Sequence, residues 1–510
     1  MANLWNTFAA RADANPSAPA IILSNGVTSF GELHTLALRY AAALAARGVG
    51  RGDVVALQLP KRQATYALLL ACLRLGAPYV FLDPKNPLER SLRIIERVRP
   101  AILFTAGKIS NNSHGRTVQL SGDDDTWLDL SEASVPSRWP DITGTDPAYI
   151  MFTSGSTGEP KGAVIPHQGV LSLIEWARNA LGAAPGERFT NINPLHFDNS
   201  VFDIYCGLLN GAALVPIETG EFVNPANWTK TARMAEASIM FAVPTLFLIL
   251  DQLGLLTPAS LPCVQKFIFG GEGYPIGKLR DFRARFTGQV KLINVYGPTE
   301  TSCICSSIEI LEEHLGASDK EFPPLGRMHD NFSYTILDNE QRSVGRGGVG
   351  ELWIGGPCVG LGYYANDEET AARFCQDPRQ NQYRSVYYRS GDLVREDDEQ
   401  RLWFHGRVDN QVKIRGHRIE LEEIDLAVQS IQGVRRAVAV ARIGPEGDEL
   451  AVAFTADRTI AADEVHTLCK EKLPNYMQPS AIIQFSELPR NANGKVDRRA
   501  IKALLEKTKP

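Results

Sequence analysis

The sequence lacks the features that mark secreted, membrane-spanning and nucleic-acid-binding proteins. The N-terminal segment MANLWNTFAARADANPSAPA has no basic start followed by a continuous apolar stretch, so we expect no secretory signal. The longest apolar run, from Ile239 to Leu250, contains Pro244 and Thr245 and falls well short of the ~20 residues that span a bilayer. A formal net charge of −5 leaves no basic excess for nucleic acid. We therefore expect a cytoplasmic protein with no membrane and no nucleic-acid partner.

Cysteine is sparse and unpatterned. The eight cysteines form no CxxC pair and no Cys/His metal spacing, which argues against a disulfide framework and against a zinc site. Cys303 and Cys305 alternate along an apolar stretch and are expected to be core thiols. A reducing compartment is therefore the expected environment.

The residues that are present predict a large α/β protein. A chain of 510 residues exceeds one ordinary core and fits a large domain with a smaller one. Short β-branched runs such as VVALQL and AILFT alternate with helical stretches such as PLERSLRIIERV. This alternation is typical of strand-helix-strand units around parallel sheets.

Two changes in the sequence pattern indicate a small β-rich piece and a separate C-terminal domain. Between Gly326 and Gly362, SYTILD and GGVGELWIGG predict strands joined by glycine-rich turns, forming a small antiparallel or β-barrel-like piece. After Gly406 a charged hairpin pattern precedes an amphipathic helix beginning near Glu420. We therefore expect a large domain over residues 1–406 and a small α+β domain over 407–510. The polar stretch KISNNSHGRTVQLSGDDDTW is expected to be a surface loop.

The segment TSGSTGEPKG, Thr153 to Gly162, is the first that indicates chemistry. It follows the strand-like AYIMF and combines three glycines, four hydroxyls and one lysine. Glycine lets the main chain approach a phosphate closely, and backbone N–H groups and hydroxyls donate to its oxygens. The spacing of Gly155, Gly158 and Lys161 does not match a Walker A loop. The competing interpretation is a flexible turn.

This segment resembles the phosphate loop of the adenylate-forming superfamily, which includes nonribosomal-peptide adenylation domains, acyl-CoA synthetases and luciferases. Further segments resemble motifs of that family in the same order and span nearly the whole chain. They are GAPYVFLDP (76–84), HFDNS (196–200), NVYGPTE (294–300), GELWIGG (350–356), YRSGD (388–392), GRVDNQVKIRGHRIE (406–420) and LPRNANGKVDR (488–498). Chance agreement of eight ordered segments is negligible. The resemblance implies a large N-terminal domain and a small C-terminal domain joined by a hinge.

The family's reaction needs cations. A substrate carboxylate oxygen attacks the α-phosphorus of ATP and pyrophosphate leaves, so negative charge must be stabilised and no proton need be removed. The resemblance implies that Lys495 bridges the substrate carboxylate and the α-phosphate, and that Arg407 contacts the ribose or a phosphate. His167 and His196 are accordingly expected to be structural or pocket-lining groups. Without the motifs, Lys495 and Arg407 would be interpreted as surface residues.

The resemblance also assigns the nucleotide contacts. Asp392 is expected to accept hydrogen bonds from both ribose hydroxyls, Tyr296 to stack on adenine, and Glu300 to bind Mg²⁺. The competing interpretations are a turn aspartate, a core tyrosine and a capping or salt-bridged glutamate. The complete expected ATP-binding set is Thr153, Ser154, Gly155, Ser156, Thr157, Gly158, Lys161, Gly271, Asn294, Val295, Tyr296, Gly297, Thr299, Glu300, Asp392, Arg407 and Lys495.

Asp198 in HFDNS discriminates between substrate classes. In amino-acid-activating members of the family the matching aspartate pairs with the substrate α-ammonium group, and a buried carboxylate needs such a cation. The competing interpretation is a helix N-cap. The pocket positions matched by their motifs are Asp198, Asn199, Phe202, Phe241, Ile268, Gly270, Val295, Cys303, Ile304 and Lys495. They are mostly apolar, with Gly270 expected to leave space, and so resemble pockets for valine, isoleucine or alanine.

The acceptor is expected to be a thiol on another molecule. The family's small domain rotates after adenylation, and Asp409 matches its hinge. No carrier domain follows LPRNANGKVDR, so we expect a separate phosphopantetheinylated carrier protein, with coenzyme A as the competing acceptor. Two other functions stay open: an acyl-CoA synthetase for another carboxylic acid, and a non-catalytic nucleotide-binding scaffold.

Overall fold

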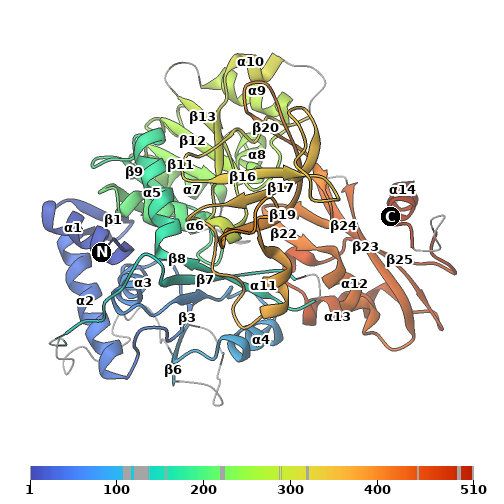
Figure 1. Cartoon of the computed structure of the whole chain (residues 1–510), viewed down its shortest axis with the longest axis horizontal. Helices are drawn as coiled ribbons and strands as arrows, with labels where there is room; N and C mark the ends of the chain where they lie inside the picture. The colour runs from blue at the N-terminus through green and yellow to red at the C-terminus, as the bar shows by residue number, and fades with distance from the viewer. Residues whose placement is uncertain are drawn as a thin grey trace. The chain divides into compact units, whose positions relative to one another are not determined.

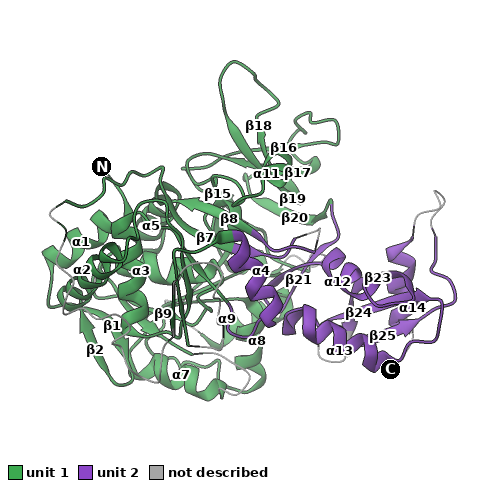
Figure 2. Ribbon diagram, turned by 90° about the horizontal axis from the view of Figure 1, so that it is seen from below, with its two compact units in different colours: residues 1–82, 98–151, 162–408 green, residues 83–97, 152–161, 409–510 purple. Residues whose placement is uncertain are grey.

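The computed structural model describes residues 2–106, 109, 116–119, 136, 138–155, 158–218, 224–286, 288, 290–316, 321–444, 447–490 and 496–507. The chain divides into two compact units (Figure 2). The first unit comprises residues 1–82, 98–151 and 162–408, and the second comprises residues 83–97, 152–161 and 409–510. Arg407 thus lies in the first unit, whereas the expected division placed it at the start of the second domain. The expected domain boundary stays a prediction.

A nine-stranded sheet dominates the first unit, with the order β15-β14-β13-β12-β11-β9-β10-β1-β2. From β13 to β1 the neighbouring strands pair in parallel, while β2, β14 and β15 pair antiparallel at the two edges. The strands are β1 (Pro19–Leu23), β2 (Gly26–Ser29), β9 (Arg188–Asn191), β10 (Ala213–Pro216), β11 (Ile239–Ala242), β12 (Lys266–Gly270), β13 (Lys291–Tyr296), β14 (Ser306–Glu309) and β15 (Arg327–Met328). The apolar run from Ile239 forms β11 and then α8 (Pro244–Gln252), as the proline within it requires.

A six-stranded sheet has the order β6-β5-β3-β4-β7-β8. Its strands are β3 (Val55–Gln58), β4 (Tyr79–Phe81), β5 (Ile102–Thr105), β6 (Arg116–Gln119), β7 (Pro147–Thr153) and β8 (Lys161–Pro166). The runs VVALQL and AILFT form β3 and β5, which confirms the predicted parallel pairing. Within the stretch expected to be a loop, residues 116–119 instead form β6, which pairs with β5. The remainder of that stretch, apart from Ile109, lies outside the described residues.

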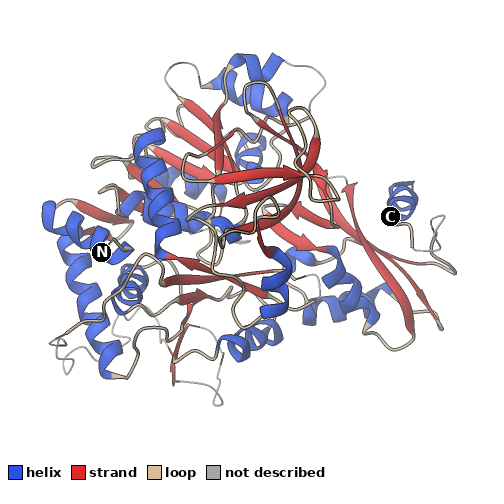
Figure 3. Cartoon of the chain, in the orientation of Figure 1, coloured by secondary structure: helices blue, strands red, loops and turns tan. Residues whose placement is uncertain are grey.

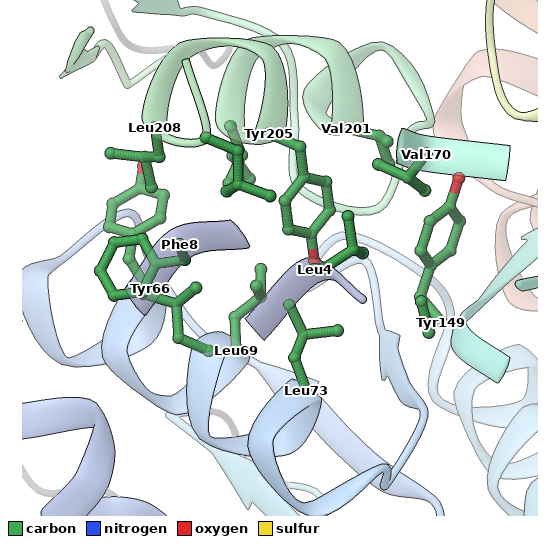
Figure 4. Packing of buried hydrophobic residues seen from close by; sticks show 14 of the residues in the cluster. Leu4, Phe8, Tyr66, Leu69, Leu73, Tyr149, Val170, Val201, Tyr205 and Leu208 are labelled. Atoms are coloured by element: carbon green, nitrogen blue, oxygen red, sulfur yellow. The ribbon is translucent and has the colours of Figure 1, made fainter. Parts of the chain in front are cut away.

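Helices cover these sheets and supply a large apolar core. Figure 4 shows Tyr205 and Leu208 facing Tyr66, Leu69 and Leu73 of α3 across this core. A capping box starts α2, because Ser29 and Glu32 each accept a hydrogen bond from the other's backbone. The helices of the first unit are α1 (Leu4–Ala14), α2 (Phe30–Ala46), α3 (Gln63–Leu75), α5 (His167–Leu181), α6 (Asn199–Val201), the π-helix η1 (Phe202–Cys206), α7 (Pro225–Met234), α8, α9 (Ile276–Arg285), the 3₁₀ turn η2 (Thr299–Thr301), α10 (Glu312–Gly316) and α11 (Asp367–Arg373).

A third, antiparallel sheet completes the first unit. It contains β16 (Ser333–Leu337), β17 (Val349–Gly355), β18 (Phe374–Gln376), β19 (Val386–Glu396) and β20 (Leu402–Arg407) (Figure 3). This is the antiparallel piece that the glycine-rich segments predicted. Long strand β19 carries Asp392 opposite Arg407 of β20.

The second unit contains α4 (Leu88–Val98) and the α+β part predicted near the C-terminus. A hairpin of β21 (Gln411–Ile414) and β22 (His417–Glu420) leads directly into α12 (Leu421–Gln429). A three-stranded sheet of β23 (Val434–Gly444), β24 (Gly447–Ala456) and β25 (Ala481–Gln484) is accompanied by α13 (Ala462–Lys472), the turn η3 (Asn475–Met477) and α14 (Arg498–Lys507) (Figure 1). Over the described part of the chain, every helix is too short or too polar to cross a membrane.

Candidate functional site

Several predicted site residues lie where neighbouring parallel strands of the nine-stranded sheet end. Phe241 of β11 lies beside Ile268 of β12, and Gly270 at the end of β12 lies beside Val295 of β13. In open α/β sheets, ligands bind at the carboxyl ends of the strands. The structure therefore brings these predicted pocket residues to the edge of the sheet where a ligand is expected.

Gly270 requires a correction. It was expected to leave space in the pocket, but a Cβ at this position would lie 2.4 Å from the backbone oxygen of Val295 and 2.7 Å from its Cγ2. The glycine is therefore needed for the close approach of β12 to β13. Its role in the structure is therefore strand packing.

Asp198 lies between β9 and the helical segment that follows. It occupies the N-cap position of α6, but its side chain makes no capping hydrogen bond. Its Oδ2 instead accepts a hydrogen bond of 2.7 Å from Thr299 Oγ1. The following Phe202 packs edge-on against Phe241, with 5.1 Å between ring centroids. The Asp198 carboxylate is half-buried, and Phe202 follows it by four positions in the same helical segment.

The turn after β13 carries the remaining pocket residues. Ser302 and Cys303 have left-handed backbone conformations, with φ of 64° and 80°. A Cβ at Gly297 would lie 2.3 Å from the Cys303 oxygen, so this turn packs closely on itself. Cys303 Sγ is 4.0 Å from Asn199 Oδ1, and Ile304 is buried next to it. Burial raises the pKa of the Cys303 thiol well above its usual range, so the thiol is neutral.

Glu300 is fully buried in the 3₁₀ turn Thr299–Thr301. Its Oε1 accepts a 2.6 Å hydrogen bond from Tyr363 Oη. Sequence reasoning missed Tyr363, because it lies 63 positions away and belongs to none of the segments used for the resemblance. Among the described residues, no group of three or more His, Cys, Asp or Glu side chains could hold a metal ion.

Asp392, Tyr296 and Arg407 form one buried cluster. Tyr296 Oη donates to Asp392 Oδ2 at 2.5 Å, and Arg407 Nη1 forms an ion pair with Asp392 Oδ1. Arg407 Nη2 also donates to the backbone oxygen of Ser390 at 3.2 Å. Burial, together with the adjacent Asp392 carboxylate, raises the pKa of Tyr296 well above its usual range. Nearby, the Asn294 amide donates to the Pro324 oxygen at 2.7 Å.

The predicted phosphate loop begins at Thr153, the last residue of β7, and lies in the second unit. Gly158 N donates to the Gly155 oxygen at 3.0 Å, and Ser154 Oγ donates to the Arg418 oxygen at 2.7 Å. Lys161 is buried, with its Nζ 3.8 Å from Glu420 Oε1. Within the described ranges the buried hydroxyl of Thr153 has no hydrogen-bond partner.

Three predicted residues, Ser156, Thr157 and Lys495, lie outside the described residues. The proposed hinge residue Asp409 follows Val408, the last residue of the first unit, and accepts a 3.3 Å hydrogen bond from Gln411 N. Gly271 follows Gly270 with a left-handed φ of 87°. The roles of all these residues stay predictions.

The two histidines differ in their surroundings. His167 is fully buried, and its Nδ1 accepts a 3.2 Å hydrogen bond from Leu4 N. Burial lowers the pKa of His167 to about 4, so the ring is neutral near pH 7. The ring of His196 packs against that of Phe197, with 4.6 Å between centroids. The packing of His167 is that of a structural group.

Comparison with known proteins identifies a family over most of the chain. A family model described as AMP-binding enzyme matches residues 8–364, and one described as AMP-binding enzyme C-terminal domain matches residues 423–495. The L-proline--[L-prolyl-carrier protein] ligase of Pseudomonas fluorescens is 33% identical over 509 residues, which cover 96% of this chain and 97% of that protein.

Other relatives are much longer than this chain. Surfactin synthase subunit 3 of Bacillus subtilis is 33% identical over 97% of this chain, which spans 38% of that protein. Among solved structures, holo-PA1221, described as an NRPS protein containing adenylation and PCP domains bound to a vinylsulfonamide inhibitor, superposes with a TM-score of 0.85 and 25% identity. That match covers 98% of this chain and 84% of the other. The chain therefore belongs to the AMP-binding enzymes of the adenylate-forming superfamily.

Proposed function

We propose that the protein adenylates a small or medium aliphatic α-amino acid and transfers it to the phosphopantetheine thiol of a separate carrier protein. The position of Asp198 carries this proposal. Asp198 occupies an N-cap position without capping the helix, and its carboxylate is oriented by a hydrogen bond from Thr299. Two predicted pocket residues, Phe202 and Phe241, pack edge-on against each other. A fixed anion together with apolar pocket residues fits a ligand with an ammonium group and an apolar side chain.

The side-chain part of the pocket supports an aliphatic substrate. Phe202, Phe241 and Ile268 are buried hydrocarbon surfaces, and the raised pKa of Cys303 keeps its thiol uncharged. None of these four residues offers a charge to a second charged group on the substrate. Because a single methylene changes discrimination by only about 1–3 kcal/mol, valine, isoleucine and alanine are all retained as substrates.

Each unit has residues that fit contacts with a nucleotide. Each oxygen of Asp392 accepts one protein hydrogen bond, from Tyr296 or Arg407, and a carboxylate oxygen has a second lone pair for a ribose hydroxyl. The hydroxyl of Thr153 has no partner within the described ranges and fits a phosphate oxygen. These contacts fit ATP as the co-substrate.

Glu300 is suited to the role of the glutamate that binds Mg²⁺ in this family. A single buried carboxylate, fixed by Tyr363, suits an ion that takes its other ligands from nucleotide phosphates and water. Bound Mg²⁺ would neutralise phosphate charge. The protein's own contribution is to hold Asp198, Asp392 and Glu300 in place around the reactants.

The proposed reaction has two steps. A substrate carboxylate oxygen forms a bond to the α-phosphorus while the bond to the bridging oxygen breaks, and pyrophosphate leaves with the charge. The acceptor thiol then loses its proton, its sulfur attacks the acyl carbon, and AMP leaves as the thioester forms. Lys495 and Arg407 are proposed to stabilise the charge of the first step. A carrier protein as the acceptor is supported by the Pseudomonas relative, a carrier-protein ligase of nearly the same length.

Exchange of labelled pyrophosphate into ATP, measured with a panel of L- and D-amino acids, tests the proposal. We expect exchange to be strongest with valine, isoleucine or alanine. Asp198→Ala should abolish it because the ammonium group loses its partner, whereas Asp251→Asn, which changes a carboxylate of α8 that pairs with Arg285, should not. Unchanged exchange by Asp198→Ala would refute amine recognition. Thioester formation on a holo-carrier protein, compared with coenzyme A, identifies the acceptor.

A further inference from the structure

A buried polar network lies behind the candidate amino-acid pocket. Lys61 is 7% exposed, and its Nζ donates to the backbone oxygens of Asn191 at 2.9 Å, Ile192 at 3.0 Å and Ile217 at 2.7 Å. These oxygens follow the ends of β9 and β10. One ammonium group therefore ties together two neighbouring strand ends at the edge of the sheet where the site lies.

Asp203 is the buried anion of this network. It is fully buried in the π-helix η1, directly after the pocket residue Phe202. Its Oδ2 accepts hydrogen bonds of 3.0 Å from the amides of both Asn191 and Asn193. Burial raises the pKa of the Asp203 carboxyl, and the attraction of Lys61 opposes that rise. The Lys61 ammonium group is attracted by the carboxylates of both Glu218 and Asp203, and this attraction offsets part of the cost of burying Asp203.

The network reaches the pocket through Asn193. Its amide donates to Asp203 and also, at 2.9 Å, to the backbone oxygen of Phe241. Asp203 therefore fixes Phe202 through the π-helix that carries both residues, and Phe241 through Asn193. These two rings pack edge-on against each other, and both are predicted residues of the amino-acid pocket.

We propose that Asp203 and Lys61 are positioning residues that hold Phe202 and Phe241, two predicted side chains of the amino-acid pocket, in place. The inference rests on the proposed amino-acid substrate. Neither residue touches the ligand, and their effect passes through Asn193 and the backbone of Phe202 and Phe241. A buried network with discrete hydrogen bonds can hold such side chains more narrowly than apolar packing alone.

Kinetics of Asp203→Asn in the full-length enzyme test the inference. We expect the KM for the amino acid in pyrophosphate exchange to rise about ten- to hundredfold, the scale of a lost hydrogen bond to a charged group. The KM for ATP should stay within about twofold, because Asp392 and Glu300 are not part of the network. The double variant Lys61→Met/Asp203→Asn should be less impaired than Lys61→Met alone, which leaves a buried carboxylate without its cation.

The matched control is Asp377→Asn, which removes another buried carboxylate, one bound to Arg379 and remote in sequence from this network. Its amino-acid KM should match that of the wild type. An unchanged amino-acid KM in Asp203→Asn, or equal increases for amino acid and ATP, would overturn the inference. If Asp203→Asn does not fold, Asn193→Ala replaces it. A rise in the amino-acid KM alone would then support the inference, and an unchanged amino-acid KM or equal increases for amino acid and ATP would overturn it. Absence of amino-acid-dependent exchange in the wild type would instead contradict the proposed function.

Discussion

Single residues at this site are best understood through their hydrogen-bond partners. Asp198 occupies an N-cap position, the role that a bare aspartate before a helix predicts, yet its carboxylate contacts Thr299 instead of the helix backbone. Lys61 looks like a surface lysine in the sequence, but it is buried against three carbonyl groups. In both cases the partner is distant in the chain, so the local sequence does not reveal the role.

Lys495 provides the residue-scale prediction. Charge develops on the α-phosphate only during adenylation, so Lys495→Ala should lower the rate of pyrophosphate exchange by about 10²–10³, the scale of one lost transition-state contact. Transfer from preformed aminoacyl-AMP to the carrier thiol should change much less. Single-turnover assays of the two half-reactions make the comparison.

Lys502→Ala is the control, because Lys502 is half-exposed on α14 and pairs only loosely with Glu506, at 3.9 Å. Its rates should equal those of the wild type. Equal losses in both half-reactions of Lys495→Ala would contradict a role confined to adenylation.

At the scale of elements, the parallel strands were predictable and the exceptions have physical causes. VVALQL and AILFT predicted β3 and β5, since buried parallel strands consist of apolar, β-branched runs. Strand β6 was not predicted, because its segment at Arg116 is polar. An edge strand pairs through its backbone and does not need apolar side chains. The π-helix after Asp198 and the contact that requires Gly270 depend on tertiary packing, which hydrophobic periodicity does not report.

Gly270 also provides a prediction at this scale. In Gly270→Ala the new Cβ would meet the backbone of Val295, so β12 and β13 must separate. We expect a loss of about 1–3 kcal/mol in the free energy of unfolding, typical of overpacking. Urea unfolding followed by circular dichroism measures this loss.

Gly277→Ala in α9 is the matched control, because nothing lies within 4 Å of the added Cβ. Alanine is also the better helix former, so this variant should be as stable as the wild type or more so. If Gly270→Ala proved equally stable, Gly270 would be a residue of open pocket space, as first expected.

For the whole molecule, the two units respond differently to acid. Burial lowers the pKa of His167 to about 4 and that of His329 to about 3, so below about pH 6.5 these two rings bind fewer protons in the folded first unit than in the unfolded chain. The free energy of unfolding therefore falls as the pH falls from about 6.5 to about 4, because the unfolded chain gains the protons that these two buried rings do not accept. Raised carboxyl pKa values have the opposite sign, because the folded state then binds protons more readily. Burial raises the pKa of Asp425 in the second unit to about 6, and it raises that of Asp203 in the first unit to about 7, which offsets part of the loss from the two histidines.

We therefore expect the first unit to lose stability between pH 7 and pH 5 and the second to lose less. Each buried histidine contributes about 2 kcal/mol at pH 5 by proton linkage. Hydrogen exchange measured at both pH values, corrected for intrinsic exchange rates, resolves the two units. His329→Phe keeps an aromatic ring against Trp176, where the centroids are now 4.5 Å apart, and removes the titrating group. In this variant the first unit should therefore lose less stability between pH 7 and pH 5 than it does in the wild type. If the two losses were equal, burial of the His329 ring would not be a cause of the acid sensitivity.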